Sequence, residues 1–443
     1  MRFRAVDIAT IVGGRLVGAD VEVAGAAIDS RTLTTGQLFV PVRGLRDGHD
    51  FIAAARQAGA AATLSAGPVV EGFPTIVVAD PEAALRALGG SARGRLGERV
   101  VGITGSVGKT STKDLVAAVL ARRLVVSASE KSFNNELGVP LTLVNAADDT
   151  EVTVVEMGAR GPGHIESLCA VAAPTIGVVT AVELVHAELM GGLDDIALAK
   201  GELVEGLPGA GIAVLNADDA RVWSMRSRTG ARVIGFGIDT GDLRATDLRI
   251  DAQLRPRFRL ESDWGHAEVV LSVRGRHQVS NALAAAAVAL ACELPLEEVV
   301  AGLAAAELSP WRMDLRTTAT GARVLNDAYN AGPASMEAAV RALAALPAVR
   351  HTAVLGVMAE LGEESAAAHR HITEVAAEVG VRIIAFGVAD YGSVDPAGPV
   401  IGRAEDIDDA LAQLGELDAG DAVLVKGSRV AGLERLAAAL LET

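Results

Sequence analysis

The chain has 443 residues, of which 50% are hydrophobic and 22% are charged, and its net charge at pH 7 is −16. This length predicts about three domains, because single hydrophobic cores stop growing beyond ~250–300 residues. The composition is typical of a globular protein able to bury large cores. The strongly negative charge argues against a nucleic-acid partner, which would normally require a basic face.

Neither an export signal nor a membrane span is expected, because charges interrupt the first residues and no run of about 18 apolar residues occurs. Only Cys169 and Cys292 are present, and they lack the spacing of a zinc ribbon or a disulfide framework. This cysteine usage fits a reducing compartment. We therefore expect a cytoplasmic protein.

Taken in chain order, the pattern predicts three α/β domains. Residues 1–97 form a small domain, which ends in a polar, glycine-bearing stretch after the helical pattern PEAALRALGGSAR. Residues 98–310 alternate short apolar runs with amphipathic stretches, as in a mostly parallel sheet covered by helices. Residues 311–443 show the same alternation after a boundary at Pro310 and predict a Rossmann-like domain.

Two segments of the middle domain have patterns of their own. Residues 242–275 alternate apolar and polar side chains, which indicates an antiparallel extension of the sheet. Residues 281–294, NALAAAAVALACEL, indicate a buried helix whose simplest role is core packing.

The segment GITGSVGKTS, Gly102–Ser111, joins an expected strand to an expected helix. The backbone N–H groups of such a turn and the positive end of the helix dipole favour a bound phosphate. The loop is a shortened variant, because the strict consensus requires glycine where Ile103 stands. ATP is favoured over GTP, since the guanine-reading N-K-x-D pattern is absent. The residues expected at the nucleotide phosphates are Thr104, Gly105, Ser106, Val107, Gly108, Lys109 and Thr110.

Three polar side chains lie near the ends of other expected elements. Glu156 ends the apolar strand EVTVVE, at the edge where α/β sheets bind ligands, and is the first candidate for a metal ligand. An ordinary strand-end carboxylate explains Glu156 equally well. His186 and Lys200, taken singly, are more simply explained by structural roles.

A set of motifs spanning almost the whole chain resembles the Mur ligases. The motifs are TGSVGKTSTK, SFNNELGVPLTL, EMGARGPGHI, IALAKGEL, GRHQVSNALAAAA, WRMDL, DAYNAGPASM, LGVMAELGEES and KGSR, in the order seen in that family. Within the family, DSRTLTTGQLFVPVRGLRDGHDFI, FNNELGVP and DAYNAGPASM are most similar to members that add D-alanyl-D-alanine to UDP-N-acetylmuramoyl-tripeptide. The D-N-P-R signature of the diaminopimelate-adding members is missing.

The resemblance implies an ATP-dependent ligase that forms a peptide bond through an acyl phosphate. The product would be the UDP-muramoyl-pentapeptide of peptidoglycan, made in the last cytoplasmic step. The implied partners are therefore small molecules, and a monomer is expected. Such phosphoryl transfer depends mainly on positioning, a lysine and metal ions.

The resemblance also assigns roles around the nucleotide. Lys109 would hold the β- and γ-phosphates, Thr110 and Glu156 would bind one Mg²⁺, and His186 would bind a second. Lys200 matches a position carbamylated by CO₂, a change that converts a cation into an oxygen ligand suited to Mg²⁺.

Further residues match family positions that complete the site. Asn281 matches an adenine-contacting asparagine, whereas Arg312 and Asp327 would reach the phosphates and ribose once the C-terminal domain closes. Lys109, Lys200, His186 and Arg312 are the expected catalytic residues. The expected substrate-binding residues are Ser30, Arg31 and His49 for the uridine diphosphate end, with Asn134, Asn135, Tyr329, Asn330, Lys426, Ser428 and Arg429 elsewhere.

Some of these assignments have structural alternatives. Ser30 and Arg31 could be an N-capping serine and a surface arginine, and KGSR could be a plain strand-to-helix turn. SEKSFNN stands where relatives usually carry T-x-G-N, and Gly332 stands where asparagine is usual. Other open functions are a different Mur ligase, a folylpolyglutamate-synthase-like amide ligase, a nucleotide-dependent switch and a non-catalytic relative that binds only the precursor.

Overall fold

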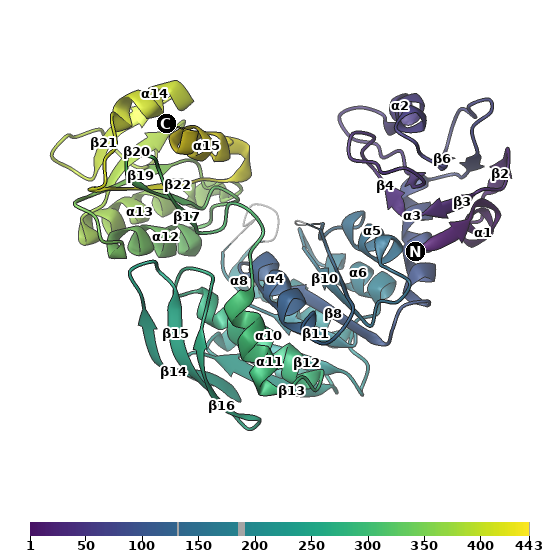
Figure 1. Cartoon of the computed structure of the whole chain (residues 1–443), viewed down its shortest axis with the longest axis horizontal. Coiled ribbons are helices and arrows are strands. Elements are labelled where there is room, and N and C mark those ends of the chain that lie inside the picture. The colour runs from purple at the N-terminus through teal and green to yellow at the C-terminus, as the bar shows by residue number, and fades with distance from the viewer. Residues whose placement is uncertain (131–132, 185–190, 443) are drawn as a thin grey trace.

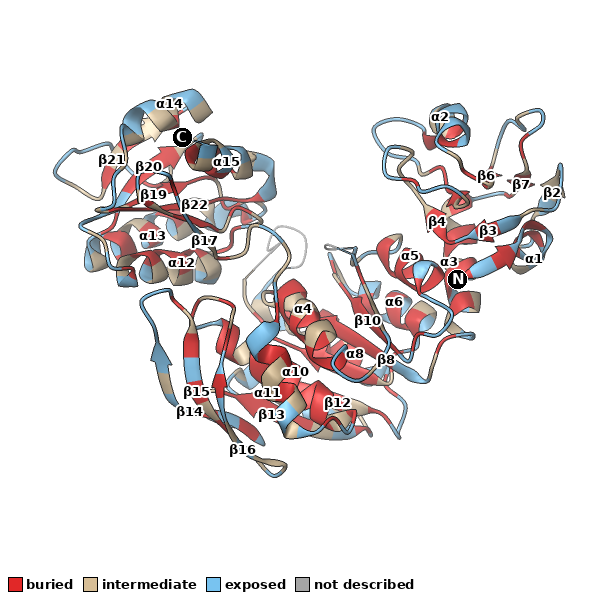
Figure 2. Ribbon diagram, viewed as in Figure 1, coloured by how far each residue is buried: buried red, intermediate tan, exposed pale blue. Residues whose placement is uncertain are grey.

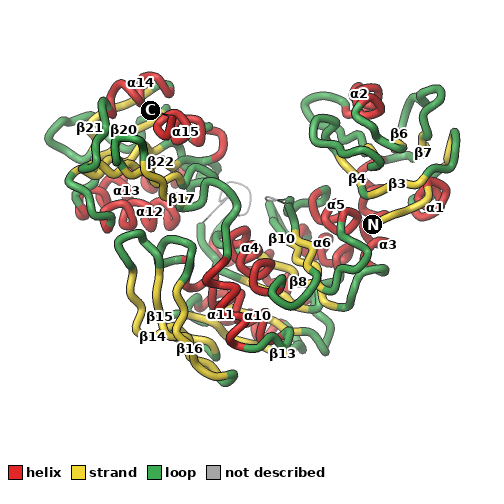
Figure 3. Tube along the Cα trace, viewed as in Figure 1, coloured by secondary structure: helices red, strands yellow, loops and turns green. Residues whose placement is uncertain are grey.

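The computed structural model describes residues 1–130, 133–184 and 191–442. The chain folds into three lobes (Figure 1), of which the first contains two sheets and the other two contain one sheet each. Helices and strands alternate along most of the chain, as Figure 3 shows. We call the lobes N-terminal (elements β1 to α3), central (β8 to α11) and C-terminal (β17 to α15). Within the described residues, none of the helices combines the length and apolar character that a membrane crossing requires.

The N-terminal lobe contains a two-stranded antiparallel sheet, β1-β3, and a five-stranded sheet in the order β2-β7-β6-β5-β4. Its last helix begins at Pro81 after Asp80, whose carboxylate accepts hydrogen bonds from the N–H groups of Glu82 and Ala83. The elements are β1 (Arg2–Arg4), α1 (Ala5–Ile11), β2 (Arg15–Val17), β3 (Glu22–Ala24), β4 (Ala26–Ala27), β5 (Leu38–Phe39), α2 (Ile52–Gln57), β6 (Ala62–Ser65), β7 (Thr75–Val77) and α3 (Pro81–Arg93).

The central lobe is organised by a nine-stranded sheet in the order β16-β15-β14-β13-β12-β11-β8-β10-β9. All neighbouring pairs from β9 to β14 are parallel. The two remaining pairs, β14 with β15 and β15 with β16, are antiparallel. The expected antiparallel extension is therefore confirmed. The strands are β8 (Arg99–Thr104), β9 (Val126–Ala128), β10 (Val152–Glu156), β11 (Ile176–Val179), β12 (Ile212–Asn216), β13 (Arg232–Gly237), β14 (Leu243–Ile250), β15 (Pro256–Ser262) and β16 (Gly265–Val270).

Helices cover the central sheet on both faces and are buried along the sides that contact it (Figure 2). The alanine-rich helix α10 packs against α4, and its run Ala282–Ala287 is completely buried, so the expected buried helix is confirmed. Small side chains allow this close approach of two helices. The helices are α4 (Lys109–Leu120), α5 (Gly138–Asn145), α6 (His164–Ala172), α8 (Leu193–Glu205), α9 (Ala220–Ser224), α10 (Gln278–Ala291) and α11 (Leu296–Ala305).

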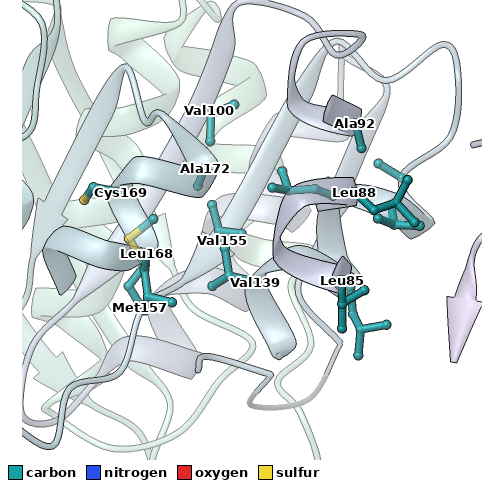
Figure 4. Close-up of a cluster of buried hydrophobic side chains, with 14 of the residues drawn as sticks. Leu85, Leu88, Ala92, Val100, Val139, Val155, Met157, Leu168, Cys169 and Ala172 are labelled. Carbon is teal, nitrogen blue, oxygen red and sulfur yellow. The ribbon is translucent and has the colours of Figure 1, made fainter. Parts of the chain in front are cut away.

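The N-terminal and central lobes share one hydrophobic core. Leu85 and Leu88 of α3 belong to the same buried cluster as Val139 of α5 and Val155 of β10, as the close-up in Figure 4 shows. A Cβ on Gly89 of α3 would lie 2.7 Å from a side-chain carbon of Pro140 on α5. The backbone of α3 is therefore in close contact with the proline ring of α5. Contiguous apolar packing of this kind makes the two lobes one packing unit.

The C-terminal lobe has a six-stranded sheet in the order β17-β18-β22-β19-β20-β21, parallel except for β17. The expected strands β18, β19, β20 and β22 are confirmed, and β17 and β21 are additional. The elements are β17 (Asp314–Thr317), β18 (Arg323–Asn326), α12 (Pro333–Ala345), β19 (Arg350–Leu355), α13 (Ser365–Val379), β20 (Arg382–Phe386), β21 (Val400–Ala404), α14 (Ile407–Leu414), β22 (Asp421–Lys426) and α15 (Glu434–Glu442).

The C-terminal lobe contacts the rest of the chain at a narrow junction. Leu254, in the turn between β14 and β15, is buried in the C-terminal core together with Met313. The linker residues Trp311 and Met313 both have positive φ, 63° and 50°, a conformation that side chains other than glycine seldom adopt. The linker begins where the N–H of Ser309 donates to Asp114 of α4 at 2.7 Å.

Candidate functional site

The phosphate loop lies where β8 ends and α4 begins, with Gly105 and Gly108 at φ +145° and +82°. A Cβ on Gly105 would collide with the hydroxyl of Thr180, and one on Gly108 would lie 2.5 Å from Oδ1 of Asn281. Both positions therefore require glycine for conformation and for space. The turn brings the N–H groups at the start of α4 to one point, which is the arrangement that binds a phosphate.

Lys109, the first residue of α4, has its side chain over this turn. Its ammonium donates to the carbonyl oxygens of Gly105 at 2.7 Å and Ser106 at 3.0 Å. Burial lowers the pKa of Lys109, the charge of Glu156 raises it, and that of Arg312 lowers it further. The lysine thus interacts electrostatically with a residue of the central sheet and with one of the linker to the C-terminal lobe.

Neighbouring segments fix the loop from the other side. The N–H of Ser106 donates to Ala181 O at 2.8 Å, and the hydroxyl of Thr180 donates to Val107 O at 2.5 Å. Thr180 was missed by the sequence analysis, although it directly follows β11, the strand beside β8. Thr110, the expected metal-binding hydroxyl, is buried one position after Lys109.

Glu156 stands at the carboxyl end of β10, next to β8, and is only 1% exposed. Its Oε1 accepts a 2.8 Å hydrogen bond from the side-chain amide of Asn134. Its Oε2 is buried and has no hydrogen-bond partner among the described residues. A buried carboxylate oxygen without a partner is costly, and a bound cation would satisfy it.

The described residues contain no group of three or more His, Cys, Asp or Glu side chains that could hold a metal ion. His186, the expected ligand of a second ion, lies outside the described residues. Its place in the site stays a prediction.

Lys200 lies on α8 and is 2% exposed. Burial lowers its pKa to about 7, helped by the charge of Lys109 and opposed by that of Glu202. Burial thus favours the neutral amine of Lys200, which is the nucleophilic form of the side chain.

Glu183 is a second residue that the sequence analysis missed. Burial raises the pKa of its carboxyl to about 7, the charge of Asp219 raises it further, and that of Lys109 lowers it. Its carbonyl oxygen accepts a 2.9 Å hydrogen bond from the hydroxyl of Ser106. Its position shortly after β11, at the ligand-binding edge of the sheet, was the signal that could have found it.

Asn281 of α10 is buried directly beside the phosphate loop. Its Oδ1 accepts from the hydroxyl of Thr112 at 3.2 Å, and its amide nitrogen donates to Gln278 at 2.9 Å. The structure therefore connects α10 to the phosphate-loop helix at the position expected to contact adenine.

In the linker that leads to the C-terminal lobe, the guanidinium of Arg312 lies over Tyr329, with its Cζ 4.0 Å from the ring centroid. The Nε of Arg312 is buried without a hydrogen-bond partner in the described part of the chain. The carboxylate of Asp327 accepts from the N–H of Met313 at 3.0 Å and from the ammonium of Lys426 at 2.5 Å. Arg312 thus keeps hydrogen-bonding capacity for an anion.

The segments after β18, β19 and β22 meet at the carboxyl ends of these strands, where α/β folds bind ligands. The hydroxyl of Ser428 accepts from the N–H of Ala359 at 2.9 Å and donates to Ala331 O at 3.3 Å. Arg429 is exposed, pairs with Glu434 at 2.8 Å and has its Cζ 4.5 Å from the centroid of Trp311. Ser428 thus links the segment after β22 to the segments after β19 and β18. Asn330, in the segment after β18, is exposed.

In the N-terminal lobe, the expected substrate residues have local partners. Arg31 pairs with Asp29 at 2.6 Å, and its side chain is 86% exposed. Nδ1 of His49 contacts Asp47 at 2.6 Å, and its Nε2 accepts from the N–H of Ala66 at 3.0 Å. Both ring nitrogens of His49 are therefore used within the lobe, and Arg31 remains accessible.

A cavity of about 500 Å³ lies between the N-terminal and central lobes. Asp29 and Thr32, which flank Ser30 and Arg31, line it from one side, and Glu130 and Phe133 line it from the other. Asn135, expected to bind substrate, accepts a 2.9 Å hydrogen bond from the N–H of Gly138, the first residue of α5.

Comparison with known proteins gives matches along nearly the whole chain. Residues 103–289 match the Mur ligase middle domain, and residues 311–429 match the Mur ligase glutamate ligase domain. A UDP-N-acetylmuramoyl-tripeptide–D-alanyl-D-alanine ligase of Mycobacterium tuberculosis (strain CDC 1551 / Oshkosh) is 42% identical, with 98% of this chain and 96% of the relative covered.

Solved structures agree with the sequence matches. MurF from Acinetobacter baumannii superposes with a TM-score of 0.88 at 28% identity, covering 100% of this chain and 99% of the other. MurF ligase from Thermotoga maritima, crystallised with ADP, has a TM-score of 0.82 at 28% identity, covering 94% and 97% of the two chains.

Proposed function

Because the chain belongs to the Mur ligase family, we propose that it joins D-alanyl-D-alanine to UDP-N-acetylmuramoyl-tripeptide with ATP. The observation that carries this function is the 42% identity over 98% of the chain to a ligase named for that reaction. The match includes the N-terminal lobe. A nucleotide-dependent switch would not explain the similarity of that lobe to a ligase. The reaction forms a peptide bond between the tripeptide and the dipeptide and releases ADP and inorganic phosphate.

The reaction has two transfers that balance in atoms and charge. A carboxylate oxygen of the tripeptide attacks the γ-phosphorus of ATP, so that an acyl phosphate forms and ADP leaves. The amine of the dipeptide then attacks the acyl carbon, the C–O bond to phosphate breaks, and the proton lost by the amine passes to the released phosphate or to solvent. Both reactants in the first step are anions, so cationic groups must offset their repulsion.

The phosphate loop carries out this positioning. Its N–H groups at the start of α4 hold the polyphosphate, and Lys109 exchanges its bonds to Gly105 and Ser106 for the outer phosphates. Arg312 approaches the same charge from the linker to the C-terminal lobe, consistent with its electrostatic effect on Lys109. Closure of that lobe would exclude water and protect the acyl phosphate from hydrolysis.

Thr110 and Glu156 would hold one Mg²⁺, and carbamylated Lys200 with His186 would hold a second. When bound, these ions would supply positive charge that offsets the repulsion between the phosphates and the attacking carboxylate. The unpartnered Oε2 of Glu156 supports the first site. The burial of Lys200 on α8 and its electrostatic interaction with Lys109 support the second, because a carbamate on Lys200 would add a negative charge and oxygen ligands within range of Lys109.

The cavity between the N-terminal and central lobes is proposed to take the uridine diphosphate end of the precursor, since it opens beside Ser30 and Arg31. The incoming dipeptide would meet the acyl phosphate near Tyr329 and Asn330. We propose the division 1–97, 98–310 and 311–443 for the three domains. A monomer working in the cytoplasm, where ATP is available, completes the proposal.

The decisive experiment measures phosphate release by the full-length protein with each reactant left out in turn. We expect release only when ATP, Mg²⁺, UDP-muramoyl-tripeptide and D-alanyl-D-alanine are all present, and mass spectrometry should find the pentapeptide. Equal release without the dipeptide would favour a nucleotide-driven switch. Use of glutamate as the amine with a folate acceptor would favour the folylpolyglutamate-synthase-like function.

A further inference from the structure

Lys426 is the last residue of β22, and its side chain is enclosed within the C-terminal lobe. It is 2% exposed. Its ammonium donates to Oδ2 of Asp327 at 2.5 Å and to the backbone oxygens of Asn330 at 2.9 Å and Asp327 at 3.5 Å. A lysine has three N–H donors, and one short segment after β18 supplies acceptors for all of them. Little capacity remains for a substrate anion.

Asp327 is held from the other side by the linker between the lobes. Its Oδ1 accepts a 3.0 Å hydrogen bond from the N–H of Met313, whose φ is +50°. Its own N–H donates to Val425 O at 3.0 Å, which extends the pairing of β18 with β22 by one residue. The carboxylate is therefore fixed between the linker and the end of β22.

The charge of Asp327 creates a difficulty at a nucleotide site. A carboxylate placed to bind ribose lies close to a polyphosphate, and like charges repel strongly where water is partly excluded. The ammonium of Lys426, in direct contact with that carboxylate, neutralises it while leaving lone pairs that can accept a hydroxyl hydrogen bond. Removing the lysine would leave the partly buried carboxylate of Asp327 without its cationic partner.

We propose that Lys426 is a positioning residue for the nucleotide, which orients and neutralises Asp327 and does not itself contact the dipeptide or the precursor. This assignment rests on the proposed function and replaces the substrate contact expected for Lys426 from the sequence. It also explains why a lysine stands at the end of a central strand, between two other strand ends that form the crevice.

The test compares full-length Lys426→Met, Asp327→Asn and the double variant by steady-state kinetics with ATP and the dipeptide varied separately. Lys426→Met should raise the KM for ATP about tenfold or more and leave the KM for the dipeptide within about twofold. In the Asp327→Asn background, the same change should add less than about twofold, because the two residues act as one unit.

Arg350→Met is the matched control. Arg350 of β19 pairs at 2.6 Å with Asp421, the first residue of β22, whereas Lys426 is the last residue of β22. This variant therefore also removes the cationic partner of a buried carboxylate. We expect a lower thermal midpoint with an unchanged KM for ATP. If Lys426→Met does not fold, Lys426→Arg takes its place, since it keeps the charge but alters the geometry, and it should raise the KM for ATP selectively.

Three outcomes would overturn the assignment. A rise confined to the KM for the dipeptide would make Lys426 a direct substrate contact. Equal effects of Lys426→Met in both backgrounds would separate it from Asp327, and an unchanged KM for ATP in Asp327→Asn would remove the nucleotide role altogether. A wild-type protein without dipeptide-dependent phosphate release would instead contradict the proposed function itself.

Discussion

The side-chain amide of Asn134 donates a 2.8 Å hydrogen bond to Oε1 of Glu156, and Oε2 of the same carboxylate is buried without a partner in the described part of the chain. Asn134 comes from the segment before α5, and Glu156 ends β10. The amide thus fixes the plane of the carboxylate and leaves one oxygen available to a cation. An orienting contact of this kind is typical of a metal ligand.

Glu156→Gln should keep the shape and the contact with Asn134 but remove the negative charge. We expect kcat to fall by about 100-fold or more, the scale for loss of one group that stabilises the transition state. The Mg²⁺ concentration for half-maximal activity should rise as well. Steady-state kinetics over a Mg²⁺ titration measures both, with exposed Glu268→Gln on β16 as the control. Equal Mg²⁺ dependence in variant and wild type would remove Glu156 from the metal site.

Lys200→Ala should abolish activity, and a short-chain carboxylate such as acetate should partly restore it. The reason is that a carbamate on Lys200 would present carboxylate-like oxygens, which a small acid can replace in the space that alanine leaves. Phosphate release with and without added carboxylate measures the effect, and intact-mass analysis of wild type in bicarbonate detects the modification. Full activity of the variant without any addition would exclude Lys200 from the site.

Gly108→Ala should weaken ATP binding far more than Gly163→Ala. Both glycines precede a helix and have nearly the same φ, +82° and +80°, so both substitutions carry similar backbone strain. Only at Gly108 would the new Cβ approach Asn281, at 2.5 Å, whereas at Gly163 nothing lies within 4 Å. Equilibrium binding of a non-hydrolysable ATP analogue compares them, and equal losses would show that strain alone is responsible.

Glu183→Gln should stabilise the protein at pH 8 and have little effect near pH 5. The pKa of Glu183 is raised from 4.5 to about 7 by burial, so its charged form is disfavoured in the folded state. The folded state therefore holds a proton more tightly than the unfolded chain. The free energy of unfolding consequently falls as the pH rises from 4.5 to about 7. Thermal midpoints of variant and wild type from pH 5 to 8 measure the difference. A constant difference across this range would contradict the assignment.

Much of the fold follows from local patterns. Short apolar runs between helical stretches marked the parallel strands of two sheets, since strands buried on both faces carry few polar residues. Strands β17 and β21 were not predicted, because both lie toward sheet edges, where pairing with a neighbour decides strand formation more than composition does. The phosphate loop was predictable because its signal is contiguous in the chain.

The amino-acid sequence by itself determined the loop, its lysine and the family to which the chain belongs, since these depend on residues close together or on motifs in a fixed order. Only the tertiary structure decided that Asn134 orients Glu156, that Lys426 binds Asp327 and that Thr180 and Glu183 border the loop. Such partners come from segments that are separated in the chain and become adjacent only after the sheets form. Their hydrogen bonds depend on that packing, and spacing along the sequence does not encode it.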